Sequence, residues 1–170
     1  LHWAIVPLIA NDIASKGYSY LNAIVSMTMV AQGAAVLAIM IKSKIASVKE
    51  LSGAAAISAF VGITEPSIYG INLKYGRAFL TANIGAAAGG LVTGLLNVNM
   101  YGFTGSIIGF PSFFTPAKFG GGISNQINFW IATIVTLVVA FACTWAFGFK
   151  DSDVEAAKKV TRRKTIGKNA

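Results

Sequence analysis

Glu65 is the residue whose type and setting are best suited to binding chemistry. It is the only acid in the segment 51–149, where the other charged side chains are Lys74, Arg77 and Lys118. An ionisable side chain at membrane depth costs roughly 2.5–3.5 kcal/mol to insert, so it normally faces a cavity or a partner. A carboxylate accepts two hydroxyl hydrogen bonds at once, which suits a polyhydroxylated ligand. The alternative interpretation is a structural ion pair with one of the three cations.

The sequence beside Glu65 indicates which element positions it. Glu65 and Pro66 interrupt an otherwise apolar stretch, 53–72. Proline breaks a helix because it lacks the backbone N–H and clashes with the preceding turn. At a broken helical element, free backbone N–H and C=O groups point at whatever the side chain meets. We therefore expect a re-entrant hairpin over 53–72, with Glu65 at its tip.

Long uncharged runs predict the helices around this hairpin. The runs 21–41 and 126–149 carry no charge, and about 20 apolar residues are enough to cross the bilayer hydrocarbon. A third helix is expected over 78–100, whereas the glycines and prolines of 101–117 predict an irregular or partly re-entrant segment. The expected fold class is therefore an all-α membrane protein, with polytopic transmembrane helices, a re-entrant hairpin and glycine-rich broken segments.

Glycine is concentrated in the middle of the chain, with fourteen of its eighteen occurrences between residues 53 and 122. Four of them, Gly85, Gly89, Gly90 and Gly94, give two small-xxx-small pairs, a spacing that lets a neighbouring backbone approach closely. Irregular backbone is tolerated in lipid only where protein or water covers it. We therefore expect the glycine-rich middle to line the interior, with the two plain helices packed around it.

The net charge of +8, from 14 basic and 6 acidic residues, is an orientation signal. Charged residues make up 12% of the chain, about half of the usual share in a soluble domain. The basic residues flank apolar runs, as the positive-inside rule describes, whereas a nucleic-acid binder needs a basic face. We therefore expect no nucleic-acid partner. The lysines of 42–49, Lys74, Arg77 and the tail 150–170 are expected in the cytoplasm, so the hairpin would begin and end on that side.

The run Gly62-Ile63-Thr64-Glu65-Pro66, together with residues 68–75 after it, closely resembles a bacterial sugar-transporter signature. The family is the membrane-embedded IIC component of the phosphoenolpyruvate-dependent phosphotransferase system, in its glucose–glucoside superfamily. The opening Leu1-His2-Trp3 is similar to a second segment of that family. The resemblance implies that 1–149 is the C-terminal, sugar-binding half of a IIC membrane domain, followed at 150–170 by a basic cytoplasmic tail or linker.

The resemblance also implies a site. Glu65 would hold sugar hydroxyls, while Thr64 and the backbone of Gly62 and Ile63 would shape the hairpin tip. His2 would be a second polar residue of the sugar pocket and could assist the hydroxyl that accepts phosphate. Residue type alone favours His2 as an interfacial residue beside a tryptophan, and this alternative stays open beside the role that the resemblance implies. We expect no metal and no cofactor.

Partners and cellular location follow from the same resemblance. A IIC component is a homodimer of the bacterial cytoplasmic membrane that binds a sugar, here of β-glucoside, sucrose or trehalose type. A phosphocysteine on a IIB domain phosphorylates the sugar at the cytoplasmic side, and a IIA domain and the phosphocarrier protein supply the phosphate. The chain would then be part of a protein-phosphohistidine–sugar phosphotransferase. It lacks the phosphorylated residue, because Cys143 stands in an apolar run without the phosphocysteine motif. The dimer contacts are expected from an N-terminal half absent from this sequence, and the C-terminus is expected in the cytoplasm.

Two other classes of protein remain open. An ion-coupled secondary transporter would also use a broken helix and a buried Glu, but it would move unmodified substrate and need no IIB partner. A membrane structural subunit would hold Glu65 in an ion pair and bind no ligand. The upstream sequence would separate these classes, because only the first should carry a cysteine-bearing IIB domain.

Overall fold

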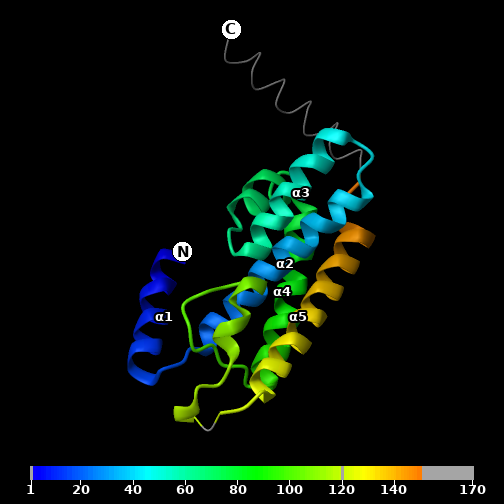
Figure 1. Ribbon diagram of the computed structural model, residues 1–170. Coiled ribbons are helices and arrows are strands. Elements are labelled where there is room, and N and C mark those ends of the chain that lie inside the picture. Colours follow the sequence, from blue (N-terminus) through cyan, green and yellow to red (C-terminus); the bar gives the residue numbers. More distant parts are fainter. Residues whose placement is uncertain (1, 120, 151–170) are drawn as a thin grey trace.

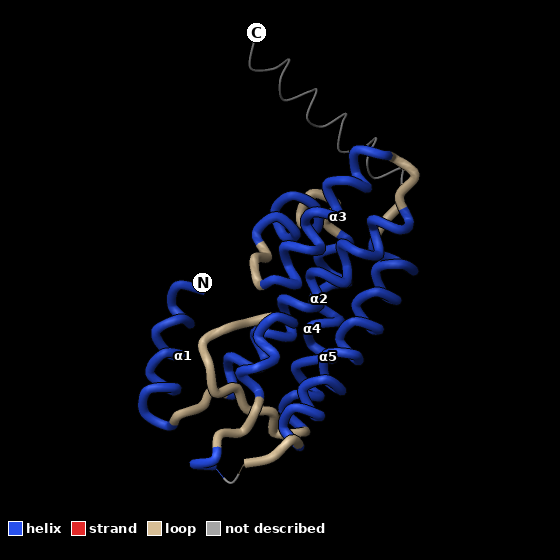
Figure 2. Tube along the Cα trace, viewed as in Figure 1, coloured by secondary structure: helices blue, strands red, loops and turns tan. Residues whose placement is uncertain are grey.

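The computed structural model describes residues 2–119 and 121–150, apart from the side chains of residues 2–4 and 119. Within that part of the chain the secondary structure is helical, with two isolated bridges and no strand (Figure 2). The all-α class predicted from the sequence is therefore confirmed. The tail expected to follow residue 150 lies outside the described residues.

Three long apolar helices form the body of the molecule (Figure 1). The elements are, in chain order, α1 (His2–Lys16), α2 (Tyr20–Lys42), α3 (Ala46–Val61), the π-helix η1 (Pro66–Asn72), α4 (Arg77–Leu95), the 3-10 helices η2 (Ile107–Phe113) and η3 (Ala117–Phe119), α5 (Ser124–Cys143) and the π-helix η4 (Thr144–Gly148). The helices α2, α4 and the continuous α5–η4 are long and apolar enough to cross a membrane. They confirm the helices predicted at 21–41 and 126–149.

Helix α2 is the central element. It contacts α3, α4 and α5, and 61% of its most apolar window is buried, against 39% for α4 and 33% for α5. The expectation that both plain helices pack around the glycine-rich segments is therefore wrong for α2. Its small residues explain the difference, because Gly33 lies against the ring of Phe60 and leaves no room for a Cβ there.

Three clusters of buried apolar side chains lie one above another along the bundle. The cluster at the end of α2 includes Ile39, Val48, Tyr75, Ala78 and Phe149. The middle cluster consists of Ala31, Ala34, Ala86 and Ala140. The cluster at the start of α2 includes Met27, Met100, Phe113 and Phe129. Burial of this apolar surface against neighbouring helices is what packs the described core.

Close packing of α4 on α5 confirms part of the glycine prediction. A Cβ added at Gly85 would run into the backbone of Ala140, and one at Gly89 would run into the side chain of Thr136. Gly94 has nothing within 4 Å of an added Cβ. The pair at 85 and 89 therefore makes the close approach, whereas Gly94 does not take part.

Helix α4 ends five residues before the predicted boundary at residue 100. Asn97 has φ +49, and Val98 N–H donates to the Thr93 carbonyl at 3.0 Å while Asn97 N–H donates to the Gly94 carbonyl at 3.2 Å. These bonds are the Schellman arrangement that closes a helix with one left-handed residue. Asn tolerates that conformation better than most residues, a signal that apolarity alone does not reveal.

Two hairpins enter the bundle from opposite ends (Figure 1). The first is α3 with η1, the hairpin predicted over 53–72. Its two ends return to one place, because Val48 and Tyr75 share a cluster with the end of α2. The second is formed by 101–113, where the sequence predicts an irregular segment. Ser106 at its tip reaches Ala59 of α3, and Phe113 returns to stack on Phe129 at the other end.

Candidate binding pocket

The first hairpin turns at Gly62. Helix α3 closes with Gly62 N–H donating to the Ala59 carbonyl at 3.0 Å and Ile63 N–H donating to the Ser58 carbonyl at 2.9 Å. Gly62 has φ +104, in the left-handed region where a Cβ is strained. This Schellman closure reverses the chain within three residues, and it brings Glu65 to the start of η1 at the inner end of the hairpin.

Hydroxyl and amide side chains fix the second hairpin against the first. Ser106 Oγ donates to the Ala59 carbonyl at 2.8 Å, close to the end of α3. Asn22 of α2 donates from Nδ2 to the Gly102 carbonyl at 3.0 Å and to the Thr104 carbonyl at 3.3 Å. Buried backbone carbonyls in an irregular segment need such donors. The two tips therefore meet halfway along the bundle as a hydrogen-bonded unit.

Where the two tips meet, they form one wall of a pocket of about 440 Å³. Helix α1 stands opposite, apart from the bundle (Figure 1). The lining residues come from α1, α2 and the two hairpins: Ile5, Val6, Ile9, Asn22, Val25, Thr28, Met29, Gly62, Thr64, Glu65, Ile68, Tyr69, Phe103, Thr104 and Gly105. A volume of this size, with a mostly apolar wall and a few polar groups, is typical of small-molecule sites.

Glu65 carries the only formal charge in this lining. Its carboxylate makes no hydrogen bond or ion pair with the residues that the structure describes, among which the single salt bridge joins Asp12 to Lys16 at 3.3 Å. The structural ion pair with Lys74, Arg77 or Lys118 is therefore not formed. The carboxylate is exposed, and its acceptor sites face the pocket with no protein donor to occupy them.

Of the other predicted site residues, some line the pocket and some do not. Gly62 and Thr64 line the pocket with Glu65. Ile63 is not in the lining; its side chain is 54% exposed, and its carbonyl accepts a 3.0 Å hydrogen bond from Ser58 Oγ. His2 begins α1, the helix that forms the opposite wall, but its side chain lies outside the described part of the chain.

Several pocket residues were not found by sequence reasoning. Asn22, Thr28, Tyr69 and Thr104 supply amide and hydroxyl groups to the lining. Tyr69 is four residues after Glu65 in η1, so the signal was present in the motif itself. Asn22 and Thr28 lie in the uncharged run 21–41, and the Gly102 carbonyl that accepts from Asn22 is 80 residues away in the sequence.

A buried polar network holds the second leg of the hairpin on α2. Asn72, at the end of η1, donates from Nδ2 to Gln32 Oε1 at 2.6 Å, and both side chains are buried. Ser67 Oγ donates to the Ala55 carbonyl of α3 at 2.7 Å. Hydrogen bonds between buried polar groups are favoured in an apolar body, so these contacts fix the position of η1 and with it the position of Glu65.

The fold and pocket define a class of protein, a helical membrane protein with a binding pocket where broken helical hairpins meet. Its family follows from comparison with known proteins. The family profile described as "Phosphotransferase system, EIIC" matches residues 1–86. The chain belongs to the phosphotransferase system EIIC family, as its Gly-Ile-Thr-Glu-Pro run indicates.

Curated relatives agree with this family. The chain is 41% identical over 161 residues to a sucrose-specific EIIBC component of Bacillus subtilis (strain 168), covering 94% of this chain and 33% of the relative. It is 32% identical over 160 residues to a β-glucoside-specific EIIBCA component of Dickeya chrysanthemi, covering 92% and 25%. It is 34% identical over 140 residues to a trehalose-specific EIIBC component of Escherichia coli (strain K12), covering 82% and 27%.

The chain therefore spans about a quarter to a third of the length of these curated relatives. The family profile covers α1 to α3, η1 and the first half of α4. No solved structure shows a significant match to the chain.

Proposed function

We propose that this chain forms the sugar-binding part of a phosphotransferase system permease and that the Glu65 pocket holds the sugar. The observation that carries the proposal is a carboxylate with no partner among the described residues, placed where two hairpin tips meet, halfway between the ends of the bundle. A carboxylate at that depth is costly without a ligand or partner. Bound sugar hydroxyls would donate to it and replace the missing hydrogen bonds.

The remaining lining suits a sugar ring. Thr64 and Thr28 place hydroxyl groups on two sides of the pocket, while Tyr69 and Phe103, which are 67% and 55% exposed, offer ring faces. A sugar has hydroxyl edges and apolar C–H faces, so it needs both kinds of contact. His2 is proposed as a further polar group of this pocket, because it begins α1, the helix that supplies Ile5, Val6 and Ile9 to the lining.

The relatives' names point to the sugar class. Those relatives are specific for sucrose, β-glucosides or trehalose, and we propose a substrate of the same class. Pocket shape decides among such sugars, and competition by each unlabelled sugar against uptake of a labelled one would rank them.

Phosphorylation needs further domains. The relatives are EIIBC or EIIBCA components, which supports a IIB partner that donates phosphate and, behind it, a IIA domain and the phosphocarrier protein. Cys143 is not a candidate phosphocysteine, because it lies at the end of α5 and outside the pocket lining. We propose a homodimer in the bacterial cytoplasmic membrane, with the Lys42 end of the bundle in the cytoplasm.

Replacing Glu65 tests the pocket. In the intact protein, Glu65→Gln removes the charge and keeps the shape. Because a hydrogen bond to a charged group contributes about 1.5–3 kcal/mol, sugar affinity should fall roughly 10- to 100-fold. Uptake of labelled sugar should fall with it at an unchanged membrane level of the protein. Glu50→Gln is the matched control, since Glu50 is exposed at the end of the bundle and outside the pocket.

The same assay separates the rival classes. Wild-type uptake by Glu65→Gln would contradict the sugar site. Uptake of unmodified sugar driven by an ion gradient, with no requirement for a IIB partner, would instead identify a secondary transporter. Accumulation of sugar phosphate that stops when the IIB partner is removed supports the proposed permease.

A further inference from the structure

A second cavity lies outside the sugar pocket, between α2 and α5. It has a volume of about 380 Å³ and is lined by Ala34, Leu37, Leu137, Val138, Phe141 and Ala142. All six side chains are hydrocarbon, so the groove offers no group that could recognise a polar ligand. Val138 is 60% exposed, which shows that the groove opens on the outer surface of two membrane-spanning helices.

An aromatic and cationic cluster continues the groove toward one end of the bundle. The Phe141 ring, part of the groove, stacks on the Trp145 ring with centroids 5.8 Å apart and an interplanar angle of 17°. Lys42 Nζ lies 6.0 Å from the Trp145 ring centroid and donates to the Trp145 carbonyl. Of its three N–H donors, this bond uses one. The Trp145 indole N–H makes no hydrogen bond with the residues that the structure describes.

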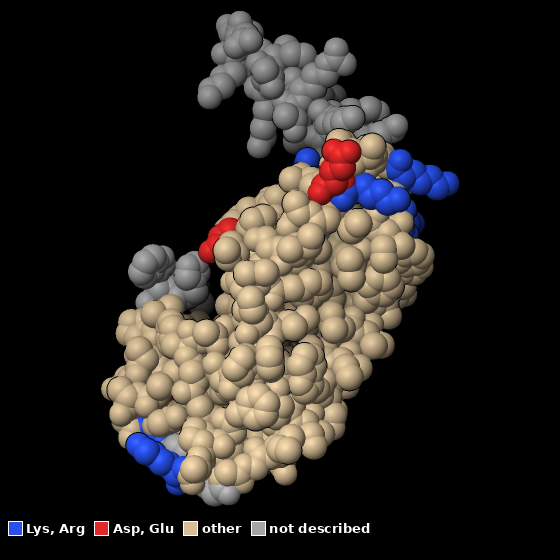
Figure 3. All heavy atoms as spheres, in the orientation of Figure 1, with Lys and Arg blue, Asp and Glu red and all other residues tan. Residues whose placement is uncertain are grey.

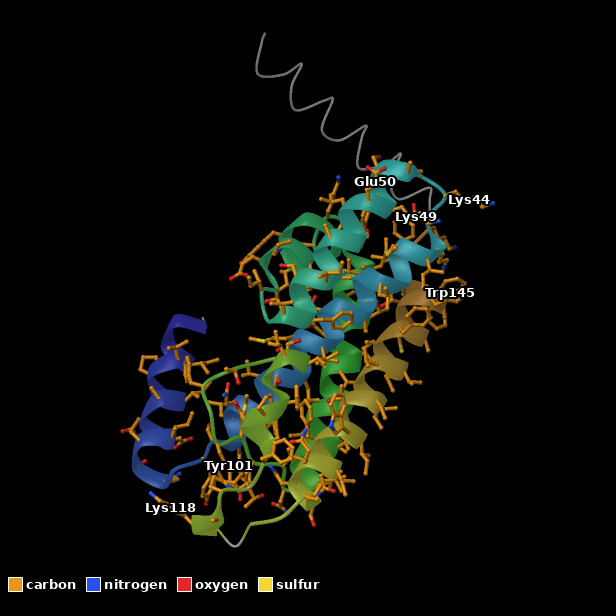
Figure 4. All side chains as sticks on the ribbon, in the orientation of Figure 1. Lys44, Lys49, Glu50, Tyr101, Lys118 and Trp145 are labelled. Carbon is orange, nitrogen blue, oxygen red and sulfur yellow. The ribbon has the colours of Figure 1, made fainter. Side chains whose placement is uncertain are left out.

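The charge around this end of the bundle is positive. Lys44, Lys49 and Glu50 lie at the end of the bundle beyond Trp145 (Figure 4), and Glu50 is the one acid at this end among the residues that the structure describes. Figure 3 shows blue basic atoms gathered at this end of the face with red acidic atoms beside them, and a separate red patch lower on the same face. A hydrocarbon groove that ends at amphipathic Trp and cationic Lys has the polarity of a lipid, with its tail below and its headgroup above.

We infer that the α2–α5 groove binds an anionic phospholipid, with an acyl chain along the six apolar side chains and the phosphate at Lys42 and Trp145. In a bilayer an empty groove loses dispersion contacts on one side, and an acyl chain is the flexible hydrocarbon at hand to fill it. Charge complementarity selects an anionic headgroup over a zwitterionic one, because the nearest side chain is a lysine with free donors. This inference does not depend on the identity of the sugar or on Glu65.

Native mass spectrometry of the intact protein, equilibrated with equal amounts of phosphatidylglycerol and phosphatidylcholine, tests the site. The wild type should retain phosphatidylglycerol preferentially. Lys42→Gln should lower that retention about five-fold, the contribution of one lysine near an anionic surface. Ala142→Phe should lower retention of both lipids, because the new ring occupies the groove. Ala87→Phe is the matched control, an exposed alanine on α4 outside the groove, and it should retain lipid as the wild type does.

Three results would overturn the inference. Equal retention by Ala142→Phe and Ala87→Phe would show that the groove holds no acyl chain. Displacement of the lipid by glycerol phosphate alone would show that Lys42 binds free anions and the groove contributes nothing. A change of oligomeric mass in Ala142→Phe would show that the groove is a protein interface. Melting temperatures of the two phenylalanine variants separate a lost site from a misfolded protein.

Discussion

At the scale of single residues, Glu65 is positioned by backbone geometry. Its carboxylate has no partner among the described residues, so its place depends on the turn before it and on the helix after it. Gly62 supplies the left-handed turn at φ +104, and Asn72 fixes the far end of η1 on Gln32. The motif resemblance identified Gly62 and Glu65 together, and the structure explains why the two residue types must occur in one run.

Gly62→Ala should therefore damage the site without touching a ligand. An added Cβ would be 3.5 Å from the Gly105 carbonyl, an ordinary contact, so crowding is not the cause. The left-handed conformation costs a non-glycine residue roughly 1–2 kcal/mol. We expect a lower melting temperature and weaker sugar binding. Gly70→Ala, with no left-handed φ and nothing within 4 Å, is the control, and equal loss in both variants would contradict the argument.

At the scale of elements, two different devices hold the helices together. Small residues let α4 lie close against α5, with Gly85 at Ala140 and Gly89 at Thr136. The hairpins are instead held by side chains that satisfy irregular backbone, such as Ser106 on the Ala59 carbonyl. The first device gives stability through contact area, and the second specifies where the two tips meet.

Gly89→Ala should loosen the α4–α5 contact, because the new methyl group would overlap the Thr136 side chain. Overpacking of this kind costs typically 1–3 kcal/mol. Gly94→Ala on the same helix has open space and should be neutral or stabilising, since alanine favours a helix by about 0.5–1 kcal/mol over glycine. Unfolding of the two purified variants in a denaturing detergent series compares them. A Gly89→Ala variant as stable as Gly94→Ala would show that α5 yields to the methyl group.

The sequence predicted these elements to different degrees. The membrane-spanning helices could be predicted because the length of an apolar run is set by one physical cause, the thickness of the bilayer hydrocarbon. The early end of α4 could not be predicted in this way, because the left-handed conformation of a single residue, Asn97, ends the helix. The central place of α2 was also missed, because it depends on which neighbours reach its small residues. In the pocket, Glu65 is distinguished by its charge, whereas Asn22 is recognised only through hydrogen bonds to residues distant in sequence.

At the scale of the whole molecule, charged side chains gather at the two ends of the bundle, and Glu65 lies between them. Lys44, Lys49 and Glu50 lie at the end where α2 finishes, and Lys118 lies at the opposite end (Figure 4). The cluster that joins Val48, Tyr75 and Phe149 shows that the first hairpin and the last helix finish at that same end. The fold therefore has the shape that a hairpin with both ends on one side of the membrane requires, because the hairpin returns to the end where it began.

Cysteine labelling tests the orientation. In a Cys143→Ser background, Lys44→Cys and Lys74→Cys should react with a membrane-impermeant reagent only from the cytoplasmic side, as the positive-inside rule implies. Lys118→Cys should react only from outside and serves as the opposite control. Labelling of Lys74→Cys from outside would contradict both the orientation and the re-entrant hairpin.

Alanine has no side-chain rotamers to lose on folding, so the middle layer of Ala31, Ala34, Ala86 and Ala140 forms without that entropic cost. The layers at either end contain Met, Ile and Phe side chains, whose ordering opposes folding more strongly as the temperature rises. Heating should therefore loosen the two end layers of the bundle before the middle layer of alanines. The hairpin tip that carries Glu65 packs beside this middle layer, where Gly33 meets Phe60, so the wall that the hairpin gives to the pocket should be the last to loosen.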